Sequence, residues 1–421
     1  MTEANTHKFK SEALKILSER GFVYQHTDIE ALDNALHSGT VTAYCGYDPT
    51  ATSLHIGHLI TITMLYWLQQ TGHRPLTLMG GATALVGDPS FRDSVRPMMT
   101  QDTIDENIKG IQSIFADLLR YGDGAKDAIM LNNMDWLKSI GYIDLLREYG
   151  PHFSVNRMLS FDSVRTRLER EQHLSFLEFN YSILQAYDFL ELYRRYGCTL
   201  QISGSDQWSN ALSGAELARR KENITLHVLT APLLTDANGK KMGKSEGNAL
   251  WLNRDLRSDY DYYQYWRNVD DAMVETMLRL FTTLPMDEVR RLAALQGAEI
   301  NDAKKILALE ATKVMRGLEA AQLAETTALE TFAGSGRSDN LPKIELSAGE
   351  ENNMSVVDLL VRAELAASKG EARRLIKGNG IRINDDIISD EAAMVQTTQF
   401  DNDNTLKLSA GKKRHILIVK A

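Results

Sequence analysis

The chain has 421 residues, 43% of them hydrophobic and 24% charged, with a formal net charge of −9. This composition is ordinary for a soluble globular protein of two or three domains, and it excludes a membrane span and a uniformly basic nucleic-acid-binding protein, although a local basic face can still exist. The two cysteines, Cys45 and Cys198, are too few for a disulfide framework and the N-terminus has no apolar signal segment, so we expect a reducing, cytoplasmic setting.

Short β-rich runs alternate with longer amphipathic stretches in the first half of the chain. We predict strands at 41–45, 75–79, 128–131, 199–202 and 226–229, and helices at 56–70, 104–119, 176–196 and 206–221. This alternation predicts parallel βαβ units in a doubly wound, Rossmann-like α/β sheet. Ligands bind at the carboxyl ends of strands in such folds, so polar side chains at those positions are the first candidates for a site.

The first predicted strand and its helix meet at His55-Ile56-Gly57-His58. A helix N-terminus attracts phosphate because it offers unpaired N–H groups and a partial positive charge. Gly57 lets a nucleotide approach the backbone closely. His55 and His58 add donors that can favour a phosphoryl transition state over the ground state.

A second motif, Lys241-Met242-Gly243-Lys244-Ser245, follows far downstream and is preceded by Lys240. Flexible lysines act as point charges on a polyphosphate. Each motif alone has a plain structural explanation, as a satisfied histidine pair or as a solvated basic loop. Together and in this order, they predict a two-part ATP site.

The predicted helix 176–196 carries Tyr181, Gln185 and Asp188 at spacing i, i+4, i+7, on one face with apolar neighbours. A carboxylate and an amide on such a face need partners, so the face either lines a pocket or is a solvated polar stripe. Further polar candidates follow predicted strands: Tyr44, Asp88, Gln201, Asp206 and Gln207.

The two motifs resemble the signature sequences of the class I aminoacyl-tRNA synthetases, with Gly243 in place of the first serine of the second signature. The strings YCGYDPTATSLHIGH, GGATALVGDPS, NYSILQAYDFL, LQISGSDQW and KMGKS, in order over 41–248, are similar to the bacterial-type tyrosyl-tRNA synthetases in particular. The resemblance implies a tyrosine--tRNA ligase, which uses ATP to form tyrosyl-adenylate and pyrophosphate and then transfers tyrosine to the 3′-terminal adenosine of tRNA(Tyr) in translation. It further implies a homodimer without membrane association, with ATP and Mg²⁺ as substrate and no tightly bound cofactor. No His, Cys or carboxylate cluster has the spacing of a zinc site.

The resemblance also implies roles for single residues of the tyrosine site. Tyr44 and Asp188 would hydrogen-bond the phenol hydroxyl of the substrate, and Tyr181, Gln185 and Asp88 would hold its α-ammonium group. Gln207 would lie near its carboxylate.

For ATP, the resemblance implies two groups of residues. The catalytic groups on the phosphates would be Thr50, His55, His58, Lys241 and Lys244. The other nucleotide-binding residues would be Gly57, with Thr61 and Asp206 facing the ribose, and Arg92 and Arg96 in an assisting role for which a mobile surface loop is the alternative.

Beyond residue 248 we predict a helical domain over 249–333, with helices at 273–281 and 303–323, a linker over 334–353 and a small α/β domain over 354–421. The resemblance implies that the helical domain contacts the anticodon stem, and the last domain looks like the RNA-binding module named for ribosomal small-subunit protein four. From 354 to 421 there are 11 lysines and arginines against 9 acidic residues. A phosphate-facing surface would include Arg373, Arg374, Lys377 and Arg382, and a solvated amphipathic helix is the alternative.

Three other functions compete with this interpretation. The sister enzymes for tryptophan share the fold and signatures, but Asp188 opposite Tyr44 favours a phenol over an indole. A regulatory paralogue with an inactive synthetase domain is disfavoured by the intact histidines and lysines. A nucleotide-dependent oxidoreductase is disfavoured because no GxGxxG follows the first strand.

Overall fold

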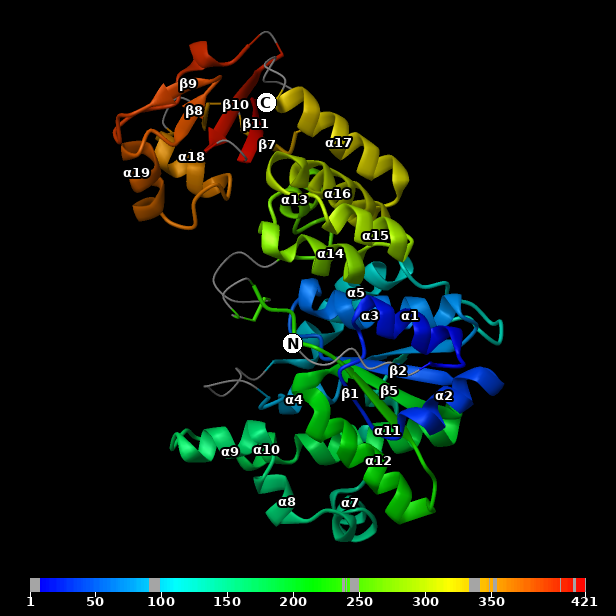
Figure 1. Cartoon of the computed structure of the whole chain (residues 1–421). Coiled ribbons are helices and arrows are strands. Elements are labelled where there is room, and N and C mark those ends of the chain that lie inside the picture. The colour runs from blue at the N-terminus through cyan, green and yellow to red at the C-terminus, as the bar shows by residue number, and fades with distance from the viewer. Residues whose placement is uncertain are drawn as a thin grey trace. The chain divides into compact units, whose positions relative to one another are not determined.

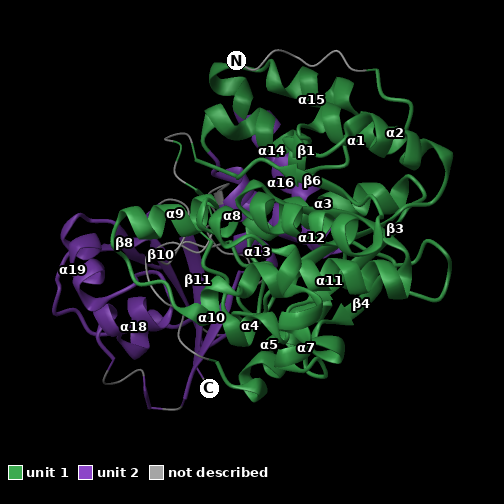
Figure 2. Cartoon of the chain, turned by 90° about the horizontal axis from the view of Figure 1, so that it is seen from below, with its two compact units in different colours: residues 1–245, 249–256, 270–300 green, residues 246–248, 257–269, 301–421 purple. Residues whose placement is uncertain are grey.

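The computed structural model (Figure 1) describes residues 8–90, 99–236, 239, 241–242, 250–332, 341–347, 349–350, 354–401, 403–411 and 414–420. The chain divides into two compact units (Figure 2). Unit 1 comprises 1–245, 249–256 and 270–300, and unit 2 comprises 246–248, 257–269 and 301–421. Within the described ranges, no helix has both the length and the apolar character that crossing a membrane requires.

Unit 1 is built on a six-stranded sheet of order β1-β6-β5-β2-β3-β4. Its parallel strands are β2 (Thr42–Tyr47), β3 (Arg74–Met79), β4 (Ile129–Asn132), β5 (Cys198–Gly204) and β6 (His227–Ala231), while β1 (Gln25–His26) pairs antiparallel with β6. The predicted doubly wound parallel sheet is therefore confirmed. The strand order reverses between β2 and β5, which is where such a sheet opens a ligand crevice.

Helices cover both faces of this sheet (Figure 1), with α1, α3 and α5 on one side and α11 and α12 on the other. The helix α3 (Ile56–Gln70) packs against β2, β3 and β5, because apolar side chains almost encircle it. The helices of unit 1 are α1 (Glu12–Arg20), α2 (Ile29–Ser38), α3, α4 (Thr83–Val86), α5 (Gln101–Ala116), α6 (Met134–Leu137), α7 (Tyr142–Glu148), α8 (Val155–Leu159), α9 (Asp162–Glu169), α10 (Phe176–Phe179), α11 (Tyr181–Tyr196), α12 (Trp208–Glu222), α14 (Val274–Phe281) and α15 (Met286–Ala293).

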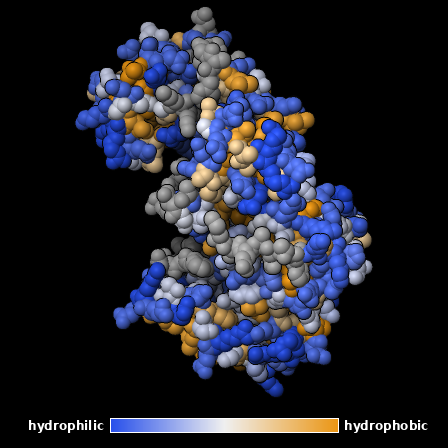
Figure 3. Space-filling view, viewed as in Figure 1, coloured by the Kyte–Doolittle hydropathy of each residue, from blue (hydrophilic) through white to orange (hydrophobic). Residues whose placement is uncertain are grey.

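Unit 2 contains a helical part and a second sheet. The helices are α13 (Asp259–Arg267), α16 (Ile300–Arg316, in this unit from residue 301), α17 (Leu318–Phe332), α18 (Val356–Arg362) and α19 (Lys369–Lys377). The sheet has the order β7-β11-β10-β8-β9, with β7 (Lys343–Leu346), β8 (Ile381–Ile383), β9 (Asp386–Ile388), β10 (Thr405–Ala410) and β11 (Arg414–Lys420). Buried apolar residues of this sheet and of α18 and α19 form one core. The side of the molecule seen in Figure 3 is mainly hydrophilic, with apolar residues in small groups.

The structure differs from the sequence prediction at several places, of which three affect the division into domains and helices. The single helix predicted over 303–323 is broken at Gly317, whose φ of 82° is a left-handed conformation that ends α16. The segment predicted as a linker over 334–353 contains β7, which pairs parallel with β11. The helices predicted as one domain over 249–333 divide between the two units, because α14 and α15 pack with unit 1.

Candidate active site

A cavity of about 540 Å³ opens at the carboxyl ends of β2 and β5, inside unit 1. It lies at the reversal of strand order, as expected for a ligand site in this type of sheet. The predicted residues that line it are Tyr44, Thr50, His55, Gly57, His58, Thr61, Asp88, Tyr181, Gln185, Asp188, Gln201, Asp206, Gln207 and Lys241. Lys244, Arg92 and Arg96 lie outside the described residues.

The start of α3 fixes the tautomers of both histidines. His55 is the N-cap residue, and its Nδ1 accepts the N–H of Gly57 at 3.1 Å. The Nδ1 of His58 accepts the N–H of His55 at 3.2 Å. An accepting Nδ1 carries no proton, so each neutral ring carries its proton on Nε2. Both rings line the cavity and thus offer Nε2–H donors suited to phosphate oxygens.

Gly57 lies close to the ring of His55, so a side chain at this position would crowd it. A Cβ atom at this position would lie 3.0 Å from Cε1 of His55 and 3.6 Å from the carbonyl oxygen of Met242. Next to it, Thr61 is buried, with its hydroxyl bonded to the carbonyl of His58 at 2.9 Å and to the Tyr47 hydroxyl at 3.2 Å.

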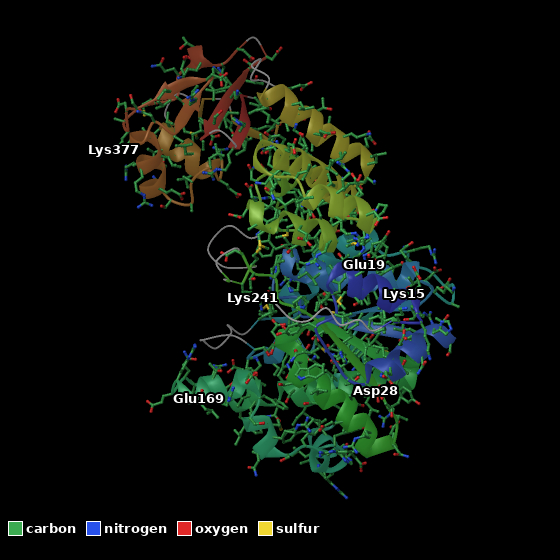
Figure 4. All side chains as sticks on the ribbon, viewed as in Figure 1. Lys15, Glu19, Asp28, Glu169, Lys241 and Lys377 are labelled. Carbon is green, nitrogen blue, oxygen red and sulfur yellow. The ribbon has the colours of Figure 1, made fainter. Side chains whose placement is uncertain are left out.

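The described residues of the lysine motif are attached to the cavity at its rim. The N–H of Met242 donates to the carbonyl of Leu234 at 2.8 Å. The Nζ of Lys241, labelled in Figure 4, pairs with the Asp206 carboxylate at 2.7 Å. The lysine expected at the phosphates and the carboxylate expected at the ribose are therefore in contact with each other.

The segment after the lysine motif pairs with the histidine motif. Trp251 and His55 form an antiparallel bridge, with their rings 6.3 Å apart and nearly perpendicular. The flanking backbone bonds are Ile56 N–H to Leu250 O at 3.1 Å and Leu252 N–H to Leu54 O at 2.9 Å. Trp251 also lines the cavity, and spacing in the sequence gave no signal for it.

Asp188 is buried at one end of the cavity, where it is 2% exposed. Its carboxylate accepts Nδ2–H of Asn133 at 2.9 Å and Nε1–H of Trp136 at 2.7 Å. Burial raises the pKa of Asp188 to about 7, the two donors oppose this rise, and the nearby charge of Asp48 adds to it.

Tyr44 lies close to this carboxylate and is 1% exposed. Burial, and then the charge of Asp188, raise the pKa of Tyr44 well above its ordinary value. The hydroxyl of Tyr44 has no hydrogen-bond partner among the described residues. A buried hydroxyl beside a buried carboxylate can receive a ligand that both donates and accepts, such as a phenol.

A second group of polar side chains surrounds Asp48. Its carboxylate accepts the hydroxyl of Tyr181 at 2.9 Å and the hydroxyl of Thr83 at 2.7 Å. Nearby, the carboxylate of Asp88 accepts Nε2–H of Gln207 at 2.7 Å and the N–H of Ser90 at 3.0 Å.

Several cavity-lining acceptors are buried without a partner in the described part of the chain. They are Oε1 of Gln185, Oε1 of Gln201 and Oγ of Ser203. Leaving a buried polar group unpaired costs about 1–3 kcal/mol. These acceptors, together with two carboxylates, therefore suit a cationic donor such as an ammonium group.

Besides Trp251, sequence reasoning missed the cavity residues Asp48, Thr83 and Asn133. Each follows a parallel strand: Asp48 follows β2, Thr83 follows β3 and Asn133 follows β4. The rule that selects carboxyl ends of strands would have found all three. Among the described residues, no three His, Cys, Asp or Glu side chains are arranged to hold a metal ion.

The predicted RNA-facing cations lie in unit 2. Arg373, Arg374 and Lys377 are exposed on α19, and Arg382 is exposed on β8. Lys377, labelled in Figure 4, lies 3.4 Å from the Glu391 carboxylate.

Residues 37–333 match the family model of the class I tRNA synthetases (W and Y), and residues 335–418 match that of the tyrosine--tRNA ligase SYY-like C-terminal domain. The chain is 56% identical over 411 residues to the tyrosine--tRNA ligase of Brucella abortus (strain 2308), covering 97% of this chain and 99% of the relative. It is 56% identical over 412 residues to that of Rhizobium meliloti (strain 1021), covering 98% and 99%. A C-terminally truncated mitochondrial tyrosyl-tRNA synthetase of Aspergillus nidulans has a similar structure, with a TM-score of 0.68 and 28% identity, over 78% of this chain and 95% of that one.

Proposed function

The chain belongs to the class I tRNA synthetases of the tryptophan and tyrosine group, and within it to the tyrosine--tRNA ligases, and from this premise we propose how its residues divide the work of the reaction. The ligase first joins L-tyrosine to the AMP part of ATP and then transfers the tyrosyl group to tRNA. The observation that supports this division best is the pair of buried groups, Tyr44 and Asp188, in a cavity that also contains the N-terminus of α3.

Tyrosine binds with its phenol between Tyr44 and Asp188. The phenol hydroxyl donates to the Asp188 carboxylate and accepts from the Tyr44 hydroxyl, which has no partner among the described residues. The α-ammonium group donates to Tyr181, Gln185 and Asp88. Phenylalanine leaves the Tyr44 hydroxyl unpaired and gives the Asp188 carboxylate no phenol proton to accept. Such a pocket rejects the analogue by about 10⁴–10⁵, a value known for a tyrosyl-tRNA synthetase and not obtained from this chain.

In the first step, a carboxylate oxygen of tyrosine attacks the α-phosphorus of ATP. A new P–O bond forms to the tyrosine carboxylate, and the P–O bond to pyrophosphate breaks. The nucleophile is the substrate itself, so the protein contributes orientation and stabilisation of negative charge. Gln207, which donates to Asp88, would hold the tyrosine carboxylate in line.

Two groups of residues stabilise the negative charge of the phosphates. The Nε2–H donors of His55 and His58, with Thr50, act from the start of α3, and Gly57 permits the close approach. Lys241 and Lys244 act on the leaving pyrophosphate, with Arg92 and Arg96 assisting. Mg²⁺ enters as part of the ATP substrate, held by phosphates and water.

The ribose of ATP is placed against Asp206 and Thr61. Because Asp206 is paired with Lys241 at 2.7 Å, nucleotide binding exchanges this ion pair for two contacts to ATP. The carboxylate is then available to the ribose hydroxyls and the ammonium group to the phosphates. Lys241 therefore contacts the phosphates only when the nucleotide is bound.

In the second step, a ribose hydroxyl of the 3′-terminal adenosine of tRNA(Tyr) attacks the tyrosyl carbonyl and AMP leaves. Arg373, Arg374, Lys377 and Arg382 would hold the RNA backbone, since all four are exposed cations of unit 2. Their contribution is electrostatic and therefore depends on salt.

We further expect a homodimer in the cytoplasm. Large apolar side chains are exposed on neighbouring helices of unit 1, namely Tyr142, Ile143, Leu146, Val155, Leu159, Phe176 and Leu177. A surface of this kind is suited to a second copy of the chain. Both cysteines are free and buried, which fits a reducing compartment.

Charging of tRNA tests the whole proposal. The full-length chain with ATP and Mg²⁺ should attach labelled tyrosine to tRNA(Tyr) and should not attach tryptophan to tRNA(Trp), because an indole cannot supply a hydroxyl to Tyr44 and Asp188. Charging with tryptophan instead would overturn the roles of these two residues, and charging with neither amino acid would overturn the proposal.

A further inference from the structure

A continuous chain of hydrogen bonds crosses the tyrosine pocket from its phenol end to its ammonium end. It starts at Asp188, which accepts Nδ2–H of Asn133 at 2.9 Å. The same Nδ2 donates to the hydroxyl of Thr83 at 3.0 Å, and Thr83 donates to the carboxylate of Asp48 at 2.7 Å. Tyr181 donates to the other oxygen of Asp48 at 2.9 Å.

The direction of every bond in this chain is determined. Oδ1 of Asn133 accepts the N–H of Ala82 at 2.8 Å, so its NH₂ group must face Asp188 and Thr83. Thr83 accepts from this NH₂ group and therefore directs its own O–H to Asp48. Tyr181 uses its proton on Asp48, which leaves its oxygen lone pairs for an ammonium group.

Burial and close packing hold the chain in place. Asn133 is 1% exposed, Thr83 is 3% exposed and Asp188 is 2% exposed. Gly80 is required here, because a Cβ atom would collide with Oδ1 of Asp48 and with Oγ1 of Thr83. Gly80, which follows β3, thus leaves room for the Asp48 carboxylate and the Thr83 hydroxyl to approach each other.

We propose that Thr83 is a positioning residue that couples recognition of the phenol hydroxyl to recognition of the α-ammonium group. It is suited to this role because its hydroxyl accepts from Asn133 and donates to Asp48 at the same time. The coupling rests on the tyrosine-binding roles proposed above. When the phenol hydroxyl engages Asp188, Asn133 and Thr83 are held in the arrangement that directs Asp48 towards Tyr181.

The electrostatics support a connection between the two ends. The negative charge of Asp48 contributes to the raised pKa of Asp188, so the two carboxylates influence each other within one network. Hydrogen bonds in a low-dielectric interior polarise their neighbours, so a change at one end is felt at the other. A substrate without the hydroxyl is then held less well at its ammonium group, although that group is unchanged.

The first test uses Tyr181→Phe in the otherwise native full-length chain. Tyrosine and phenylalanine have the same ammonium group, so uncoupled ends predict that this variant lowers kcat/KM by the same factor for both. Coupling predicts that kcat/KM for tyrosine falls about tenfold more than kcat/KM for phenylalanine in ATP–pyrophosphate exchange. The phenylalanine used in the assay must contain no tyrosine.

The second test removes the coupling hydroxyl. With Thr83→Val, the effect of Tyr181→Phe should become equal for both amino acids, and Thr83→Ser should restore the difference. The matched control is Thr77→Val, since Thr77 is also fully buried and its hydroxyl bonds Tyr121 at 2.8 Å away from the cavity lining. In this control the difference between tyrosine and phenylalanine should persist.

The outcomes separate the coupling from the proposed function. If the native full-length chain shows no pyrophosphate exchange with tyrosine, both the coupling and the proposed function are overturned. Equal factors for tyrosine and phenylalanine in an active enzyme overturn only the coupling, as does a difference that persists in Thr83→Val. Because the first test needs no change at Thr83, it holds even where Thr83→Val fails to fold.

Discussion

Asp188 shows how burial, rather than residue type, sets the chemistry of a side chain. The side chain is 2% exposed and accepts hydrogen bonds from Asn133 and Trp136. Burial raises its pKa to about 7, whereas the pKa of an exposed aspartate is far lower. Because this carboxylate shares a helix face with Tyr181 and Gln185, the sequence left two interpretations open, a pocket or a solvated polar stripe, and the structure places it in the cavity. The two donors could not be predicted from spacing, since Asn133 and Trp136 come from a different part of the chain.

The raised pKa of Asp188 gives a pH dependence with a defined sign. The carboxylate accepts the phenol proton only when it is ionised, so KM for tyrosine should rise as the pH falls through about 7 in the free enzyme. Asp188→Asn should give a higher KM that no longer changes over this range. Initial rates of pyrophosphate exchange between pH 5.5 and about 8.5 check this, and a KM in the native enzyme that is flat over the range would contradict it.

Lys241 is expected to act on the transition state rather than on tyrosine. Lys241→Ala should lower the single-turnover rate of adenylate formation about 10- to 100-fold, with the dissociation constant of tyrosine nearly unchanged, since the contact proposed for the lysine in the reaction is with phosphate and not with tyrosine. Rapid-mixing fluorescence gives both quantities. Equal losses in tyrosine affinity and rate would place Lys241 at the amino acid instead.

At the scale of elements, the parallel strands and the long helices α3, α5, α11 and α12 were predicted to within a few residues, apart from the break between α10 and α11, because hydrophobic periodicity is a local property. Two of the strands that were missed have non-local causes. β1 is two residues long and exists only by pairing with β6, and β7 joins β11 from the opposite end of its domain. The break at Gly317 depends on a single left-handed residue inside an apolar helical pattern.

Arg20 illustrates how an element is attached to the catalytic unit. It is 4% exposed, donates to the carbonyls of Thr282 and Leu284 beyond the end of α14, and lies 4.4 Å from the Trp67 ring of α3. Arg20→Met should lower the free energy of unfolding by about 2–4 kcal/mol, because charged hydrogen bonds to buried carbonyls are lost.

Equilibrium urea unfolding measures this loss. Arg290→Met is the matched control, since Arg290 is 59% exposed and water screens its ion pair with Glu19, so this substitution should change the stability little. Equal effects of the two substitutions would show that Arg20 does not hold α14 in place.

At the scale of the whole molecule, composition and motif order predicted a catalytic part followed by a helical part and a small α/β domain. The boundaries could not be predicted, because they depend on packing between distant segments. The helices α14 and α15 belong with unit 1, and β7 lies inside the predicted linker. A cut that spares the last domain must therefore precede Leu341.

The C-terminal cations should matter for tRNA and not for tyrosine activation. In the full-length chain, Arg373→Ala with Lys377→Ala should weaken tRNA binding about tenfold and reduce its salt dependence, while pyrophosphate exchange is unchanged. Arg362→Ala is the control, because Arg362 is an exposed arginine of the same unit that is paired with Glu350 at 3.0 Å. Equal charging kinetics for the native chain, the double variant and Arg362→Ala would show that this surface does not bind the tRNA.

Tyrosine-dependent exchange of labelled pyrophosphate into ATP, without tRNA and with phenylalanine and tryptophan in parallel, tests the central claim most directly. A pocket in which Tyr44 and Asp188 bind a phenol predicts exchange with tyrosine and essentially none with the other two amino acids. Exchange driven by tryptophan, or equally by phenylalanine, would contradict the assignment of these two residues.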